Sequence, residues 1–128
     1  MITEDYVNYE LAKLLKEKGF DENTHCQYLV SGAHYGEIGE YNITDRSRNP
    51  EWFIQAPTLQ MAMKWLREVH HLEIYLEHDA IQENNNWWYG IGKYTKGCIS
   101  IQYESGSDYA TYELASETAI KYCLENLI

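Results

Sequence analysis

Apolar residues in this chain change from helical spacing to strict alternation, and this change constrains the fold more than any other feature. Between residues 72 and 104 apolar and polar residues alternate in three runs, a pattern typical of half-buried strands. Tyr94-Thr95-Lys96-Gly97 predicts the turn of a hairpin joining the last two runs. Consecutive strands this close in sequence indicate antiparallel pairing.

Three other segments carry apolar residues three and four positions apart and predict amphipathic helices. Gly19 is a natural end for the first helix, and the second should end near His70 or His71. The residues expected to cap the three helices at their N-termini are Thr3, Thr58 and Thr111. The apolar stripes include Leu11 and Leu15, then Leu66 and Val69, then Ala119, Ile120 and Cys123.

The stretch between the first two helices is less regular and predicts three shorter strands, over residues 26–30, 37–43 and 52–56. The expected order is therefore helix, three strands, helix, three strands, helix. This is an α+β fold with antiparallel strands and helices packed on one side, in a single domain spanning residues 1–128. Whether the two strand-and-helix halves are a duplication stays open.

The balance of 10 basic and 20 acidic residues gives a formal net charge of −10, spread along the chain. Such a chain repels phosphate, which disfavours direct binding of nucleic acid or of an anionic membrane. The excess of carboxylates serves solubility, or alternatively mimics nucleic acid in an inhibitor that occupies a nucleic-acid-binding groove. An odd number of cysteines without a CxxC pair argues against disulfides and zinc, and we expect a cytoplasmic protein.

Candidate catalytic and metal-binding groups are few. His70 and His71 are adjacent and do not fit the i, i+4 pair of a zinc helix, and Cys26 with His34 is an arbitrary nucleophile pair. The glycines of Gly90-Ile91-Gly92-Lys93 lie inside a predicted strand and not at the start of a helix, so they predict no phosphate loop. Residues 79–86 lack the pattern of a calcium loop. We therefore expect no catalytic residues, metal or cofactor, and a non-enzymatic protein.

Three stretches of the chain together resemble a set of short hypothetical proteins of gut anaerobic bacteria, their phages and their integrated elements. They are residues 6–21 (YVNYELAKLLKEKGFD), 56–70 (APTLQMAMKWLREVH) and 119–128 (AIKYCLENLI), which cover the three predicted helices. The resemblance implies a phage or mobile-element context. Because those proteins have no assigned activity, it implies no catalytic residues.

The later strands predict a second face that carries aromatic side chains. If one set of alternating residues faces the helices, Tyr75, Trp88, Tyr94 and Gln102 lie on the opposite face. Gly90 and Gly92 would leave a flat or hollow patch beside them. The set expected to face the helices is Leu72, Ile74, Leu76, Trp87, Tyr89, Ile91, Ile99, Ile101 and Tyr103.

Exposed Tyr and Trp side chains on a sheet suit protein binding or the stacking of a ring. The aromatic face could be covered by the earlier strands, by self-association, or by a separate partner. The function we expect is that of a non-enzymatic protein-interaction module. The alternatives are a small-molecule-binding protein with a pocket around Tyr75, Trp88 and Tyr94, and the acidic inhibitor.

Overall fold

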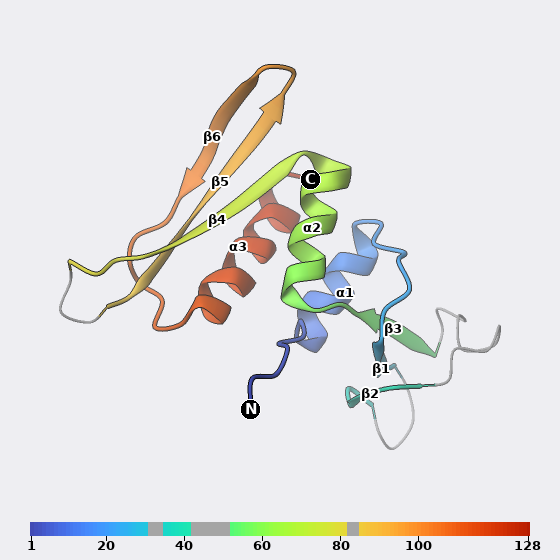
Figure 1. Ribbon diagram of the computed structural model, residues 1–128. Helices are drawn as coiled ribbons and strands as arrows, with labels where there is room; N and C mark the ends of the chain where they lie inside the picture. The colour runs from blue at the N-terminus through green and yellow to red at the C-terminus, as the bar shows by residue number, and fades with distance from the viewer. Residues whose placement is uncertain (31–34, 42–51, 82–84) are drawn as a thin grey trace. The chain divides into compact units, whose positions relative to one another are not determined.

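The computed structural model describes residues 1–30, 35–41, 52–81 and 85–128 (Figure 1). The described part contains three helices and two three-stranded antiparallel sheets, so the predicted α+β class and element order are confirmed. The elements are α1 (Tyr9–Glu17), β1 (Cys26–Leu29), β2 (Ile38–Gly39), β3 (Phe53–Ala56), α2 (Leu59–His70), β4 (Leu72–His78), β5 (Trp87–Thr95), β6 (Cys98–Glu104) and α3 (Tyr112–Asn126).

The chain divides into two compact units, Met1–Thr58 and Leu59–Ile128. The first contains α1 and the sheet β2-β1-β3, and the second contains α2, α3 and the sheet β4-β5-β6. That residues 1–128 behave as one domain stays a prediction.

Helix α1 begins later than expected. Its N-cap is Asn8, whose side-chain oxygen accepts a hydrogen bond from the Leu11 N–H at 2.8 Å, so the predicted cap at Thr3 is wrong. The reason is tertiary: Tyr6 forms an antiparallel bridge with Thr58, and the Val7 N–H donates to the Pro57 carbonyl oxygen at 3.0 Å. Backbone groups held in such a bridge are extended and are not available to a helix.

The C-terminus of α1 agrees with the sequence. Gly19 has a φ of +99°, the left-handed conformation that glycine adopts without steric cost after a helix. The N–H of Gly19 donates to the Lys16 carbonyl oxygen at 3.1 Å and so satisfies one of the last free carbonyls. The apolar face of α1 buries Leu11, Ala12 and Leu15 and packs against β3.

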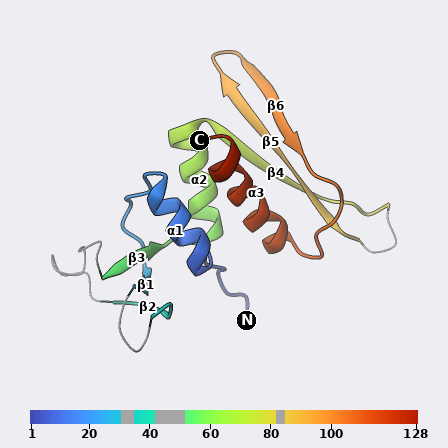
Figure 2. The same cartoon turned by 180° about the vertical axis from the view of Figure 1, so that it is seen from behind.

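In the second unit, α2 and α3 both pack against the sheet β4-β5-β6 (Figures 1 and 2). Leu66 of α2, Ile120 of α3 and Ile91 of β5 are fully buried. Thr111 caps α3 as predicted, because its hydroxyl oxygen accepts a hydrogen bond from the Leu114 N–H at 3.0 Å. Cys123 is buried as a small apolar residue, also as predicted.

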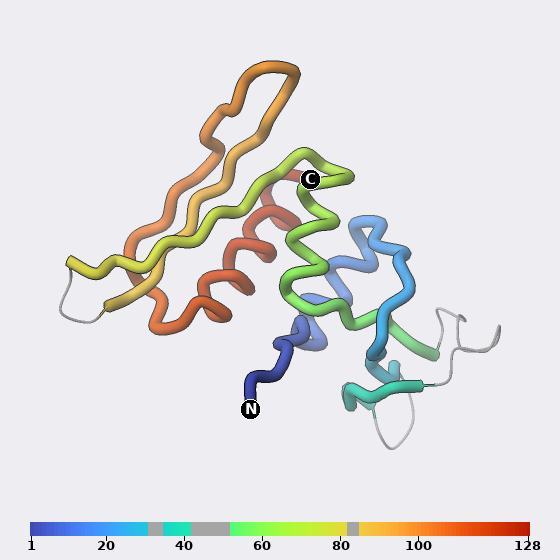
Figure 3. Tube along the Cα trace, in the orientation of Figure 1, coloured from blue at the N-terminus to red at the C-terminus, as the bar shows by residue number. Residues whose placement is uncertain are grey.

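The boundaries of α2 also follow the sequence. The helix begins directly after Thr58 and ends at His70, and His71 turns the chain into β4 with a φ of +57°. Figure 3 shows the sharp change of direction of the chain between α2 and the strand that follows. One residue of its predicted apolar stripe, Val69, lies in the last turn and is 54% exposed. The predicted hairpin is present, with Lys96 and Gly97 joining Thr95 and Cys98.

Candidate interaction surface

The pairing of β4 with β5 separates two faces of the second sheet. Directly opposed residues of an antiparallel pair point to the same side, so Ile74 with Ile91 and Leu76 with Tyr89 share one face. That face is turned to α3: the ring of Trp87 packs edge-on against Tyr112, with centroids 5.3 Å apart. The opposite side carries Tyr75 with Gly90 and Glu77 with Trp88, and we refer to it as the outer face.

Tyr75 and Trp88 lie together on the outer face, as the sequence predicts. Their rings form an edge-to-face pair with centroids 5.9 Å apart. The Tyr75 ring also covers Gly90, because a Cβ atom placed on Gly90 would lie only 2.0 Å from the ring carbon Cζ. The hollow expected beside Gly90 is therefore filled by Tyr75.

The Tyr75 hydroxyl donates a hydrogen bond to Glu104 Oε1 on β6 at 3.1 Å. Burial of the ring, and then the hydrogen bond to Glu104 and its charge, raise the pKa of Tyr75 above 10. The phenol therefore stays protonated at neutral pH and serves as a hydrogen-bond donor. This bond ties β4 to β6 across the central strand.

A β-bulge changes the face that part of β6 presents. Tyr103 pairs with Ile91 but Ile101 pairs with Gly92, so Gln102 is an extra residue without an opposing partner. Because one inserted residue reverses the alternation, Ile99 and Ile101 lie on the outer face and not toward the helices. The expectation that they face the helices is wrong for this reason.

The two isoleucines are largely open to solvent. Ile99 is 61% and Ile101 57% exposed. A Cβ atom on Gly92 would lie 3.0 Å from Cγ2 of Ile99, so the Ile99 side chain lies across this glycine. Tyr103, beyond the bulge, keeps the predicted direction and stacks on Tyr122 of α3, with ring centroids 4.1 Å apart.

Tyr94 and Gln102, the other two predicted site residues, do not join the Tyr75–Trp88 pair. Tyr94 opposes Ile99 in the pairing of β5 with β6, so the alternation keeps it on the outer face. The Tyr94 hydroxyl donates to the Arg67 carbonyl oxygen in the last turn of α2 at 3.2 Å. The Gln102 amide donates to the Ser100 carbonyl oxygen at 3.3 Å. Among the described contacts neither residue touches Tyr75 or Trp88, so the four predicted residues do not form one cluster.

The predicted site does not include Ile99, Ile101 and Glu104, which the structure places on the outer face. The signal that could have found them is Gly92, since a glycine inside a strand often marks a bulge. With the bulge placed beside Gly92, the alternation of β6 assigns Ile99 and Ile101 to the outer face.

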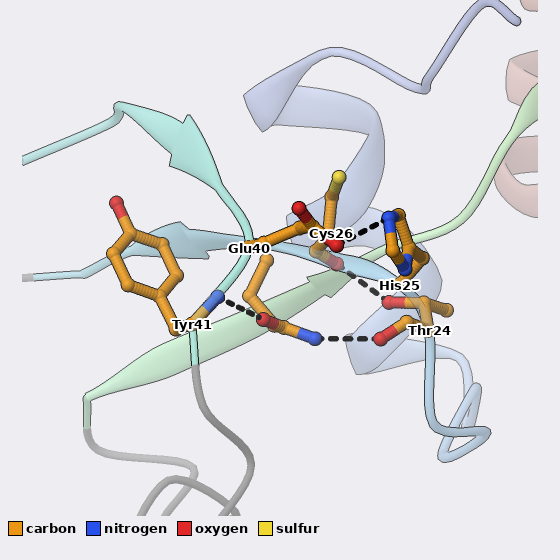
Figure 4. A network of polar contacts seen from close by, with 6 residues as sticks. Thr24, His25, Cys26, Glu40 and Tyr41 are labelled. Atoms are coloured by element: carbon orange, nitrogen blue, oxygen red, sulfur yellow. Dashed lines mark hydrogen bonds and ion pairs between the residues drawn. The ribbon is translucent and has the colours of Figure 1, made fainter.

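The first unit contains a separate polar cluster that includes Thr24, Cys26 and Tyr41 (Figure 4). Gln27 joins these residues. The buried Gln27 amide donates to the Thr24 carbonyl oxygen at 2.6 Å, and its Oε1 accepts from the Tyr41 N–H at 3.2 Å. The Thr24 hydroxyl lies 2.6 Å from the Cys26 carbonyl oxygen and 2.8 Å from Gln55 Oε1. Because these buried groups satisfy one another, the cluster joins the preceding loop to the sheet and needs no ligand to explain it.

His25 lies beside this cluster and is paired with Glu40, with Nε2 and Oε1 2.5 Å apart (Figure 4). Both side chains are mostly exposed, so water screens the pair and it stabilises the fold little. The pairing of Cys26 with His34 lies outside the described residues, because His34 is not among them.

Other reactive groups are placed as follows. Burial raises the pKa of the Cys123 thiol to about 12, so it stays protonated and unreactive at neutral pH, whereas Cys98 on β6 is exposed.

In the described ranges no three His, Cys, Asp or Glu side chains are placed to hold a metal ion. Within the same part of the chain, none of the helices has the length and apolarity needed to cross a bilayer.

The chain was compared with protein-family models, with curated proteins and with solved structures, and none of the three comparisons finds a match.

Proposed function

We propose that this protein is a non-enzymatic protein-interaction module that acts in the cytoplasm in a phage or mobile-element context. Its binding surface is the outer face of β4-β5-β6. The observation that carries the proposal is the exposure of Ile99 and Ile101 on the same face as the Tyr75–Trp88 pair. Large apolar and aromatic side chains gathered on a sheet face are typical of protein-binding surfaces.

The fixed positions of these side chains support protein binding. The Tyr75 ring is held by Gly90, Trp88 and Glu104, so little side-chain entropy is lost when a partner packs against it. A partner that covers this face would remove the two isoleucines from water, which is the main favourable term in association.

The small-molecule alternative is supported less well. It needs Tyr75, Trp88 and Tyr94 around one pocket, whereas Tyr94 is bonded to Arg67 and the Tyr75 ring occupies the space above Gly90. A small ligand gains most from a concave site that surrounds it. The outer face instead offers the projecting side chains that suit a flat partner surface.

The test is affinity capture from host cells with a tagged full-length chain, followed by quantitative mass spectrometry. A variant with Ile99→Ser and Ile101→Ser should lose the captured protein, because most of the apolar area of the contact is removed. The matched control is Ile81→Ser, which changes an isoleucine that is 98% exposed in the loop after β4. Circular dichroism should show that all three chains are folded.

Equal capture of the same protein by wild type and by the Ile99/Ile101 double variant would contradict the proposal. Loss of that protein by Ile81→Ser as well would also contradict it, because the contact would then not depend on the outer face.

A further inference from the structure

Strand β6 (Cys98–Glu104) forms one edge of the second sheet, since the strand order is β4-β5-β6. All seven of its residues are exposed. Natural edge strands are commonly protected by lysine, proline or another charge along their length, or by a β-bulge such as the one at Gln102. From Cys98 to Ile101, the regular part of β6 before the bulge, the edge has neither a charged residue nor a proline. It has the composition of a strand that accepts another strand.

The backbone groups that point to the open edge can be identified from the register. One of them, the Ile99 carbonyl oxygen, accepts a weak contact from the Cys98 thiol at 3.9 Å, which a paired strand would replace. The Tyr94 N–H donates to the His71 carbonyl oxygen at 3.1 Å, on the β4 side of β5. The N–H and C=O of one strand residue point to the same side, so both backbone groups of Tyr94 point to β4 and away from β6. Tyr94 and the opposing Ile99 are therefore a pair without hydrogen bonds between them. The N–H and C=O of Ile99 therefore point to the free edge, and those of Ile101, opposite Gly92, do the same.

We propose that β6 pairs with β6 of a second copy of this chain, antiparallel, about a two-fold axis at Ser100. In this register Ile99 of each copy faces Ile101 of the other, and the two residues exchange both backbone hydrogen bonds. The two sheets then form one continuous sheet of six strands. The four isoleucines lie side by side on the joined outer face.

Charge selects a second copy as the occupant. Within the hairpin β5–β6, Lys96 lies in the turn and Glu104 lies at the opposite end of β6. An antiparallel partner related by a two-fold axis at Ser100 places the turn that carries Lys96 of one copy beside the end of β6 that carries Glu104 of the other, and the symmetry repeats this contact. The edge is thus complementary to itself in charge as well as in apolar side chains.

The pairing is independent of the proposed function, because it requires only the purified chain. It would enlarge the outer face if that face binds a partner, but it can form whether or not such a partner exists. A failed capture experiment and a failed dimerisation experiment therefore contradict different proposals.

The first test uses disulfide trapping at the two-fold axis. Residues at a non-hydrogen-bonded antiparallel pair have Cα atoms about 4.5 Å apart, which lies within the roughly 4.4–6.8 Å that a disulfide spans. In a Cys98→Ser background, Ser100→Cys should form a covalent dimer under mild oxidation.

The matched control for the trapping is wild type, whose exposed Cys98 would face Gln102 of the other copy. Two Cys98 residues would then be offset by four positions, about 13 Å along the strand, and should not crosslink. An absence of crosslinking by Ser100→Cys, or efficient crosslinking through Cys98, would overturn the proposed register.

The second test measures the dimer constant by sedimentation equilibrium. Lys96→Glu and Glu104→Lys should each weaken the dimer at least about fivefold, because each brings two like charges close together. The double variant Lys96→Glu with Glu104→Lys should recover most of the dimer affinity, because it brings opposite charges together again. Glu104→Lys also loses the Tyr75 hydrogen bond, so the recovery on adding Lys96→Glu reports the contact between copies.

A chain that stays monomeric at all accessible concentrations would overturn the proposal. The proposal would also be overturned if Lys96→Glu with Glu104→Lys formed a dimer no tighter than that of Glu104→Lys alone. A dimer of unchanged affinity in the variant Ile99→Lys with Ile101→Lys would overturn it as well.

Discussion

At the scale of single residues, Gly90 determines where the Tyr75 ring lies. Any side chain at this position would occupy the space of the ring, and the ring in turn contacts Trp88 and Glu104. Aromatic side chains that cover a glycine on a neighbouring strand are a known device for stabilising a sheet at that glycine. The shape of the outer face therefore depends on the absence of one methyl group.

We expect Gly90→Ala to destabilise the protein by about 1–3 kcal/mol, the usual cost of overpacking. Gly90 does not have a positive φ, so the cost comes from displacement of the Tyr75 ring and not from the backbone. Urea denaturation measures this loss in the free energy of unfolding. The control is the Tyr75→Ala background, in which Gly90→Ala should lower the free energy of unfolding much less. Equal costs in both backgrounds would show that the ring is not the cause.

His70 is a second residue with a specific physical consequence. Its Nε2 is buried, and among the described residues no hydrogen-bond partner reaches it. Burial, and then the neighbouring His71, lower the pKa of His70 below 6.5. The folded state therefore binds the His70 proton more weakly than the unfolded state does.

It follows that the neutral His70 contributes stability that is present above pH 6.5 and is lost as the pH falls below that value. We expect the free energy of unfolding to fall between pH 7.5 and pH 5.5, and to fall less in His70→Phe, which cannot be protonated. Urea titrations at both pH values measure the difference, with the exposed His25→Asn as a control. A pH-dependent loss in His70→Phe as large as in wild type would contradict this assignment.

At the scale of elements, tertiary contacts move a boundary that local sequence places elsewhere. Thr3 with Glu4 and Asp5 has the composition of a helix start, yet α1 begins after Asn8 because Tyr6 and Val7 pair with the segment that leads into α2. The bulge in β6 acts in a similar way, since one extra residue, Gln102, reverses the faces of Ile99 and Ile101.

The helix boundary gives a direct prediction. Asn8→Ala should lower the free energy of unfolding by about 1 kcal/mol, the typical contribution of a side-chain cap. Thr3→Ala should change it by less than about 0.5 kcal/mol, as expected for an exposed residue outside the helix. Thermal and urea denaturation measure both. A larger effect of Thr3→Ala than of Asn8→Ala would restore the boundary that the sequence suggests.

At the scale of the whole molecule, the two compact units raise the question of cooperativity. The sequence predicts one domain, and in one domain a local loss of stability is shared by every element. Gln27→Ala is a suitable perturbation, because it leaves the Tyr41 N–H and the Thr24 carbonyl oxygen without their partner in the first unit.

We expect Gln27→Ala to cost about 1–3 kcal/mol, the usual price of unsatisfied buried groups. In one cooperative domain, hydrogen exchange by mass spectrometry should show the same loss of protection in peptides from α1 and from α3. Protection lost in α1 but retained in α3 would show that the units unfold separately.

The type and order of the elements could be predicted from the sequence alone, because both depend on local spacing. Alternation identifies β4, β5 and β6, helical spacing identifies the three helices, and Gly19 and Thr111 mark boundaries through their own backbone and side chain. Part of the candidate surface followed in the same way, since Tyr75 and Trp88 lie on the face where the alternation places them.

Only the tertiary structure decided the rest, because it depends on pairing between distant segments. Whether Ile99 points inward or outward depends on which residue of β5 it opposes, and whether Gly90 leaves a hollow depends on the ring of Tyr75 on another strand. The sequence by itself therefore determined which elements form, while register and packing between strands decided which side chains the surface presents.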